Sequence, residues 1–366
     1  MRALGAHAAG SGCAAQIAEA DPQALGATYW FDALPYSVPY SVTIRFTGFR
    51  FGVEGNPEAG DRFERVERVD GLTADSGRVA VTARVQDINP GTWRVTATPV
   101  VQADAQAAAA AARTATKPGP LPQSVLTART RLAPLVHGPG VRPWIWPTLV
   151  GLGTAVAITV QAALLARAHL DVAAAIVISL VASVVGFLGA KFWFLALHRR
   201  HPRTFLTAGA CIQGFLVGAF GTLAIAAAVF RLPVGAFLDA TTPGLFFGMA
   251  IGRPGCFLGG CCAGRPTGSR RGLWSSDRRL AVRRYPVQLV EAGVALCLGT
   301  ATLALALAVR PPVPGAVFIG AVAAYTFVRQ LLFPLRADPR TRKGRALTMA
   351  VCALVIVAAL VVSALT

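Results

Sequence analysis

Residues 244–267 read GLFFGMAIGRPGCFLGGCCAGRPT, and this stretch decides how the fold is interpreted. Its first half is apolar and carries Gly244, Gly248 and Gly252 at four-residue spacing. On a helix this spacing leaves one face without side chains, so another helix or a lipid can approach the backbone closely. We therefore predict a membrane-spanning helix that packs through its glycines and ends at the turn that follows.

The turn after this helix begins with Arg253 and is rich in glycine, including Gly255 and Gly264. An arginine offers a forked guanidinium, and glycines leave backbone N–H groups unobstructed. Both features suit a ligand that carries a phosphate. We therefore predict that this turn binds an anionic group.

Cys256, Cys261 and Cys262 lie among these glycines, and three interpretations remain open. In the first they form a redox or acyl-accepting thiol site, because the nearby Arg253 cation would lower a thiol pKa. In the second they bind a metal, but a fourth ligand and C-x₂-C spacing are lacking, so we expect no metal. In the third they are small side chains that pack a tight turn, with or without a disulfide.

The composition of the chain indicates a multi-pass membrane protein. Of 366 residues, 54% are hydrophobic and 14% are charged, and the mean hydropathy is +0.54. Such values require membrane spans. The net charge of +18 would also fit a nucleic-acid binder, but the arginines cluster at the ends of apolar runs. We therefore expect anionic lipid as the partner and no nucleic acid.

Apolar runs of about 20 residues predict a polytopic α-helical membrane protein with about seven transmembrane helices. The predicted spans are 147–166, 172–197, 205–230, 234–252, 287–309, 313–335 and 346–366. Four charged residues fall within or at the edge of these spans, and such groups usually face the bundle interior and pair there. They are Lys191, Asp239, Glu291 and Arg329.

The N-terminal part of the chain has a different character. Residues 42–46 and 93–97 alternate apolar and polar residues with a period of two, and turn signals separate such runs. They predict a small immunoglobulin-like β-sandwich over residues 29–102. Residues 1–28 are expected to be irregular, residues 103–145 to form an Ala/Pro-rich linker, and residues 146–366 to form the transmembrane domain.

Three separated motifs resemble those of the prolipoprotein diacylglyceryl transferase family. The family pattern Gly-Arg-x-Gly-Asn-Phe-x-Asn-x-Glu-x-x-Gly is matched by Arg253, Gly255, Phe257 and Gly264. Residues 285–292, YPVQLVEA, resemble a His-Pro-Ser-Gln-Leu-Tyr-Glu segment of the family and retain its Gln and Glu as Gln288 and Glu291. Arg329 lies where the last functional arginine of the family falls, and the resemblance covers roughly residues 146–366.

Four of the chain's departures from the family pattern bear on the expected reaction. Gln213 lies where the family has an essential His, and Cys256 and Cys261 lie where it has an Asn and an acidic residue. Phe333 replaces a Glu one helical turn after the last arginine.

The resemblance implies an enzyme of the cell membrane that transfers the diacylglyceryl group of phosphatidylglycerol to a cysteine thiol in a prolipoprotein segment, without a cofactor. It implies that Arg253 and Arg329 stabilise charge on the lipid phosphate. Glu291 is interpreted either as the base for the thiol or as a structural ion pair with Lys191 or Arg329. Substrate-binding roles are implied for Gly255, Cys256, Gly264, Gln213 and Gln288.

Two other functions are kept as alternatives. One is a membrane thiol–disulfide protein that uses Cys256, Cys261 and Cys262, and the other is a non-catalytic lipid-binding scaffold. The sidedness of the Arg253 turn also has two interpretations. The positive-inside rule places the turn and the β domain in the cytoplasm, whereas the family resemblance implies that the turn lies outside it.

Overall fold

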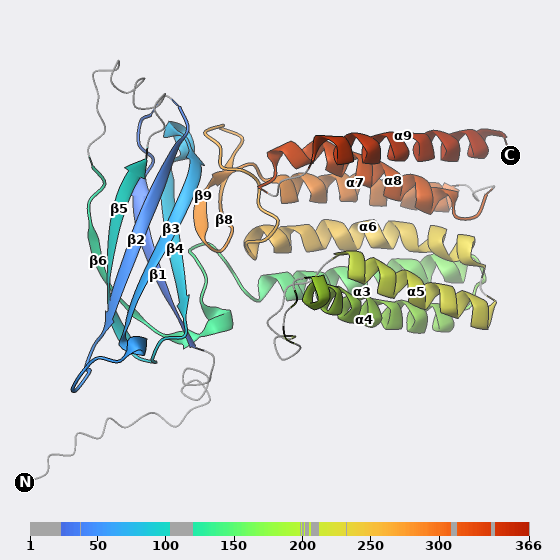
Figure 1. Ribbon diagram of the computed structural model, residues 1–366. Helices are drawn as coiled ribbons and strands as arrows, with labels where there is room; N and C mark the ends of the chain where they lie inside the picture. Colours follow the sequence, from blue (N-terminus) through green and yellow to red (C-terminus); the bar gives the residue numbers. More distant parts are fainter. Residues whose placement is uncertain are drawn as a thin grey trace, which may run out of the picture. The chain divides into compact units, whose positions relative to one another are not determined.

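The computed structural model describes residues 23–36, 38–102, 120–197, 199, 201, 205, 212–231, 233–308, 313–337 and 341–365 (Figure 1). The chain divides into two compact units. The β unit comprises Met1–Trp146, Cys256–Gln288 and Leu335–Ala337. The helical unit comprises Pro147–Gly255, Leu289–Pro334 and Asp338–Thr366.

The β unit contains two antiparallel sheets (Figure 1). The first has the strand order β7-β1-β4-β9-β8, and the second has the order β3-β2-β5-β6. The strands are β1 (Gln23–Asp32), β2 (Tyr40–Arg50), β3 (Arg62–Leu72), β4 (Arg78–Gln86), β5 (Thr92–Gln102), β6 (Ser124–Arg129), β7 (Arg131–Leu132), β8 (Leu273–Ser276) and β9 (Leu280–Arg284).

The hydrophobic core of the β unit follows from the period-two alternation of its strands. Alternate residues Val42, Ile44 and Phe46 of β2 are fully buried, as is Trp93 of β5. They pack in one cluster with residues of β1 and β4. Alternation places every second side chain on the same face of a strand, so each sheet contributes one apolar face. An N-terminal all-β region is therefore present, as the sequence predicted.

The sheets extend beyond the predicted limits of the β domain. β1 begins at Gln23, before the expected start at residue 29, and β6 lies inside the stretch expected to be a linker. β6 pairs with β5 from Thr92↔Arg129 to Ala97↔Ser124. Residues 1–22 and 103–119 of the expected irregular and linker segments lie outside the described residues. A six-residue strand that lies against a longer neighbour has too short a pattern to be recognised from the sequence alone.

A hairpin from the segment between helices α6 and α7 completes the first sheet. β9 pairs with β4 through Ala80↔Ala281 and Val81↔Leu280, and β8 pairs with β9. The Trp274 indole N–H donates to the Arg78 carbonyl at 2.9 Å, 196 residues away in sequence. Because the hairpin and the N-terminal strands share a sheet, they lie on the same side of any membrane that the helices cross.

In the part of the chain that the structure describes, the apolar runs form the long helices α3 (Ile145–Arg167), α4 (Val172–Leu197), α5 (Ile212–Phe230), α6 (Val234–Leu258), α7 (Val287–Ala308), α8 (Ala316–Leu332) and α9 (Arg342–Leu365). Among the described residues, six helices are long and apolar enough to cross a membrane, and Gly214–Ala226 of α5 forms a shorter apolar helix. The chain is therefore a polytopic helical membrane protein. The predicted seventh span, 205–230, includes residues outside the described ranges and stays a prediction.

The glycines of α6 pack against α3, as their spacing predicted. A Cβ atom added to Gly153 of α3 would lie 2.6 Å from the carbonyl oxygen of Gly248. One added to Gly248 would lie 2.8 Å from the carbonyl oxygen of Gly153. A Cβ atom added to Gly244 would likewise come too close to the carbonyl oxygen of Ala157. Since real Cβ atoms do not approach so closely, only glycine permits this contact between the two backbones.

Two of the four charged residues in the spans bind backbone groups. Both carboxylate oxygens of Asp239 on α6 accept hydrogen bonds at the start of α8, from the N–H of Gly315 at 2.6 Å and of Phe318 at 3.0 Å. A helix start has N–H groups without partners, so Asp239 caps α8 from a neighbouring helix. The Lys191 ammonium donates to the Phe205 carbonyl at 2.9 Å.

Candidate functional site

The other two charged residues in the spans, Glu291 and Arg329, form an ion pair that Arg253 joins. Glu291 on α7 lies 3.1 Å from Arg253 on α6, measured from Oε2 to Nη1. Its second oxygen, Oε1, lies 3.5 Å from Nε of Arg329 on α8. The Glu291 side chain is 1% exposed, whereas those of Arg253 and Arg329 are 14% and 27% exposed. A buried carboxylate is therefore held between two arginines that solvent or a ligand can still reach.

The chain direction brings these three residues to the same end of the helical unit. Arg253 lies near the end of α6, Glu291 near the start of α7 and Arg329 near the end of α8. Consecutive helices that cross a membrane run in opposite directions. The end of α6, the start of α7 and the end of α8 therefore lie on the same side. A core cluster that contains Phe246, Ala295 and Ala321 packs the three helices together.

Tyr325 joins this cluster and was missed by the sequence reasoning. It lies four residues before Arg329 on α8, is 7% exposed, and its ring packs on Phe246 with centroids 5.8 Å apart. Its hydroxyl lies within electrostatic reach of Arg253, Glu291 and Arg329. The four-residue spacing to Arg329 places both side chains on one helix face and could have identified it.

The end of α6 shapes the start of the glycine turn. Gly260 adopts a left-handed backbone with φ +69°, and the N–H of Cys261 donates to the carbonyl of Cys256 at 3.0 Å. This is a Schellman motif, in which a left-handed glycine ends a helix and satisfies a free carbonyl. The glycine is required here because other residues adopt this conformation at a cost.

The three thiols of this turn form a cluster in the β unit. Cys256, Cys261 and Cys262 are free thiols that hydrogen-bond to one another. Hydrogen bonds from Cys256 and Cys261, together with the positive charge of Arg336, lower the pKa of Cys262. Among the residues described, no group of three or more His, Cys, Asp or Glu side chains is arranged to hold a metal ion. The cluster is therefore built from thiols and one arginine.

Gln288 and Gly264 hold the same turn. The Gln288 amide is buried and donates to the Cys261 carbonyl at 2.9 Å. Gly264 forms an isolated bridge with Arg336 and leaves no room for a side chain beside the Tyr285 carbonyl. Both residues thus support the turn backbone in this structure.

Two further site residues were predicted from the sequence, Gly255 and Gln213. Gly255 lies in α6, two residues after Arg253, at the limit of the helical unit. Gln213 lies in the first turn of α5, and its side chain is outside the described part of the structure.

Arg284 was not singled out as a site residue, but it anchors the turn. Its guanidinium is 2% exposed and donates to the Gly264 carbonyl at 2.8 Å and to Asp277 at 2.6 Å. This ties the β8–β9 hairpin to the glycine turn. A buried arginine is seldom apparent from a sequence that contains many exposed ones.

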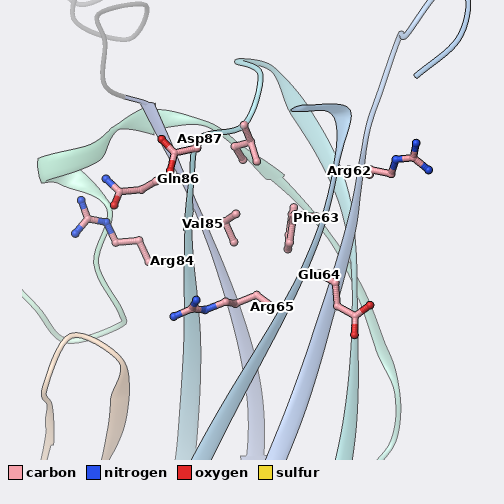
Figure 2. Close-up of a pocket in the computed structure, with 9 residues that line it drawn as sticks. Arg62, Phe63, Glu64, Arg65, Arg84, Val85, Gln86 and Asp87 are labelled. Carbon is pink, nitrogen blue, oxygen red and sulfur yellow. The ribbon is translucent and has the colours of Figure 1, made fainter. Parts of the chain in front are cut away.

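The β unit also contains a pocket. It has a volume of about 470 Å³ and lies between β3 and the end of β4 (Figure 2). Phe63 and Val85 point toward each other at its centre, and Arg84 points away from them (Figure 2). None of the site residues predicted from the sequence lines it.

Comparisons with known proteins bear on the helical unit and the turn. The family model described as prolipoprotein diacylglyceryl transferase matches residues 145–365. Three curated proteins named phosphatidylglycerol–prolipoprotein diacylglyceryl transferase, from Dehalococcoides mccartyi strains BAV1, 195 and CBDB1, are each 36% identical over 107 residues. The match covers 28% of this chain and 41% of each relative, so the chain spans about two fifths of their length.

Proposed function

The chain belongs to the prolipoprotein diacylglyceryl transferase family, and on this basis we propose that it transfers a diacylglyceryl group from phosphatidylglycerol to a cysteine thiol of a prolipoprotein. The proposed location is the cell membrane. We further propose that residues 205–230 form a seventh span and that the β unit is an immunoglobulin-like sandwich.

The observation that carries the proposal is the pairing of Glu291 with both Arg253 and Arg329. Each guanidinium has five N–H donors, and one carboxylate cannot occupy all of them. The donors that remain suit the phosphate of a lipid headgroup, which is negatively charged and accepts several hydrogen bonds. The two arginines are therefore proposed to hold the phosphate of phosphatidylglycerol.

In the proposed reaction the thiol sulfur attacks a glyceryl carbon of the lipid. A sulfur–carbon bond forms, the carbon–oxygen bond to the phosphate breaks, and glycerol phosphate leaves with the electron pair. Negative charge on the phosphate increases as the bond breaks, so Arg253 and Arg329 stabilise the transition state more than the bound lipid.

The thiol must also lose its proton, because the thiolate is the nucleophile. Of the three proposed catalytic side chains, Glu291 is the one that can accept a proton. When a lipid phosphate takes up donors of Arg253 and Arg329, the carboxylate is released from part of its pairing. Glu291 is therefore proposed to orient the arginines before the lipid binds and to receive the thiol proton afterwards.

The test compares three substitutions in the full chain, in nanodiscs that contain phosphatidylglycerol. Arg253→Ala should reduce transfer to a cysteine-containing acceptor peptide on the order of 10- to 100-fold, because a charge-assisted hydrogen bond to the phosphate is lost. Arg253→Lys keeps the charge but loses the fork, so a reduction of about tenfold is expected. The matched control is Arg270→Ala, since Arg270 is exposed and lies in the same loop.

Arg270→Ala should change only the weak, salt-sensitive attraction to an anionic surface. Equal losses for Arg253→Ala and Arg270→Ala would contradict a specific phosphate site. Growth of a transferase-depleted strain that carries the wild-type chain tests the reaction itself. Failure of the well-expressed wild type to restore growth, with no transfer in nanodiscs, would contradict the proposed function.

A further inference from the structure

Two arginines and one histidine lie close together in the β unit. Arg84 comes from β4, His137 from the segment after the short helix Ala133–Leu135, and Arg278 from the turn between β8 and β9. The positive charges of Arg84 and Arg278 act on each other and on His137. In Figure 2, Arg84 extends from β4 toward the green segment.

Backbone carbonyls fix the positions of these groups. Arg84 Nη2 donates to the Ala133 carbonyl at 2.7 Å, and Arg278 Nε donates to the Gly259 carbonyl at 3.1 Å. The N–H of Gly138 donates to the Arg278 carbonyl at 3.0 Å, which holds the segment of His137 against the hairpin. Each arginine therefore has a defined direction, and among the described residues no further side-chain hydrogen bond of either guanidinium is found.

The cluster has no anionic partner in the described structure. None of the described ion pairs involves Arg84, His137 or Arg278. His137 hydrogen-bonds to the Pro134 backbone, and its Nε2 atom is buried with no hydrogen-bond partner among the described residues. Like charges repel, and a buried polar atom without a partner costs free energy. A bound anion would relieve the repulsion between the two arginines, and its charge would favour protonation of His137.

The backbone at Arg278 provides a second, independent observation. Its φ is +79°, in the left-handed region that favours glycine. A side chain in this region costs about 1–2 kcal/mol, and such strain is concentrated at functional sites. Arg278 is one of six described non-glycine residues with a positive φ, and in this turn that conformation fixes the backbone from which its side chain extends.

We propose that Arg84, His137 and Arg278 form a binding site for a tetrahedral oxyanion of the phosphate class. Such an anion presents several acceptor oxygens, which match two guanidinium forks, and its negative charge would favour a protonated His137 beside them. The site is separate from the proposed transfer reaction and requires none of its residues. Free phosphate and a phospholipid headgroup share this chemistry.

The experiment follows the ring carbon resonance of His137 by NMR in the detergent-solubilised full chain, with His137→Gln used to assign the signal. Inorganic sulfate is the probe, because its charge stays constant near neutral pH. Sulfate should shift the resonance in a saturable way that chloride at equal ionic strength does not reproduce. Arg84→Gln and Arg278→Gln should each weaken sulfate binding about tenfold, as expected for one charge-assisted hydrogen bond. Arg94→Gln is the control, since Arg94 is exposed on β5 in the other sheet.

The pH dependence provides a readout that a purely structural role would not give. Burial and the charges of Arg278 and Arg84 lower the pKa of His137, and these two arginines are the charged groups described as acting on it. A bound anion would raise this pKa, so sulfate should bind more tightly at about pH 6 than at about pH 8. The dependence should disappear in His137→Gln, in which sulfate binding is followed by isothermal titration calorimetry because the variant lacks the reporter resonance.

Loss of a repelling charge should leave the sulfate-free Arg84→Gln chain at least as stable as the wild type. If Arg84→Gln does not fold, Arg84→Lys, which keeps the charge and loses the fork, takes its place and should bind sulfate more weakly. A His137 resonance that responds equally to sulfate and chloride would overturn the proposal. Equal weakening by Arg94→Gln would overturn it as well.

The two sources of the anion are then separated in nanodiscs. If phosphatidylglycerol, but not phosphatidylcholine, shifts the His137 resonance without added salt, the ligand is an anionic lipid headgroup. If inorganic phosphate is required in both lipids, the ligand is a free phosphate compound. Absence of any shift in all four mixtures would contradict the proposal. Arg253→Ala should leave these shifts unchanged, which separates this site from the proposed phosphatidylglycerol site.

Discussion

The two units of this protein achieve close packing by opposite means. In the β unit, large side chains such as Trp93, Phe46 and Tyr40 fill the space between two sheets. In the helical unit, α3 and α6 meet where side chains are missing, at Gly153 and Gly248. In water, the burial of apolar surface drives association. In lipid, neighbouring helices gain little from hiding apolar groups, and close backbone contact becomes the main source of attraction.

The β unit carries exposed as well as buried ion pairs, whereas Asp239 and Glu291 of the helical unit depend on groups of neighbouring helices. In the β unit, the ion pair of Arg45 and Glu64 lies on an exposed face, where it contributes little to stability. In the helical unit, Asp239 and Glu291 are each satisfied by groups of a neighbouring helix. A charge in lipid is costly without such partners, so each one constrains how the helices pack.

The largest effect is expected from the core of the β unit. Trp93→Ala should destabilise it by about 3–5 kcal/mol, because a fully buried indole is replaced by a cavity. Amide hydrogen exchange of the solubilised full chain would measure the loss in the strands. Trp30→Ala is the matched control, since Trp30 is 40% exposed and stacks on Trp274. Its loss should be about 1 kcal/mol, and equal losses would refute the assignment of Trp93 to the core.

A smaller effect is expected where the helices meet at glycine. Gly153→Ala should destabilise the contact of α3 with α6 by about 1–3 kcal/mol, because the new Cβ meets the Gly248 carbonyl and backbone cannot move aside easily. Gly151→Ala, two residues earlier on α3, meets nothing within 4 Å and should be neutral or slightly stabilising. Thermal unfolding in detergent compares the two variants. If Gly151→Ala is as harmful as Gly153→Ala, the packing argument fails.

The smallest expected effect is a loss of stability of the β unit at low pH. Hydrogen bonds from Asn89 and Arg50 lower the pKa of Asp61 from 3.8 to about 2. The folded pKa is below the unfolded value, so this stabilisation is complete above about pH 4 and disappears as the pH falls through 2. Denaturant unfolding of the strands at a series of pH values would detect the loss. Asp61→Asn should remove this part of the pH dependence. If stability still falls with pH in this variant as it does in the wild type, groups other than Asp61 cause the loss.

Several features of the fold could be predicted from the sequence because their signals are local. Apolar runs of about 20 residues identified the membrane helices, and the period-two alternation around Val42 and Trp93 identified the β region. The spacing of Gly244 and Gly248 predicted close helix packing. Each signal lies within one element, where periodicity alone determines which side chains share a face.

The candidate site was accessible from the sequence only in part. Glu291 and Arg329 were predicted because ionisable residues in apolar runs are rare, and Arg253 because it begins a glycine-rich turn; their catalytic roles remain predictions. The partner of Glu291 was left open between Lys191 and Arg329. The structure pairs Glu291 with Arg329 and also with Arg253.

By itself, the sequence determined the polytopic helical class, the N-terminal β region, and the charged and glycine positions on which the family resemblance depends. Only the tertiary structure decided that the β8–β9 hairpin completes the first sheet, that Tyr325 faces the arginine cluster, and that Arg84, His137 and Arg278 meet. The reason is physical: each of these contacts joins segments far apart in the chain. Such contacts form only when whole elements pack, and no local pattern of residues records them.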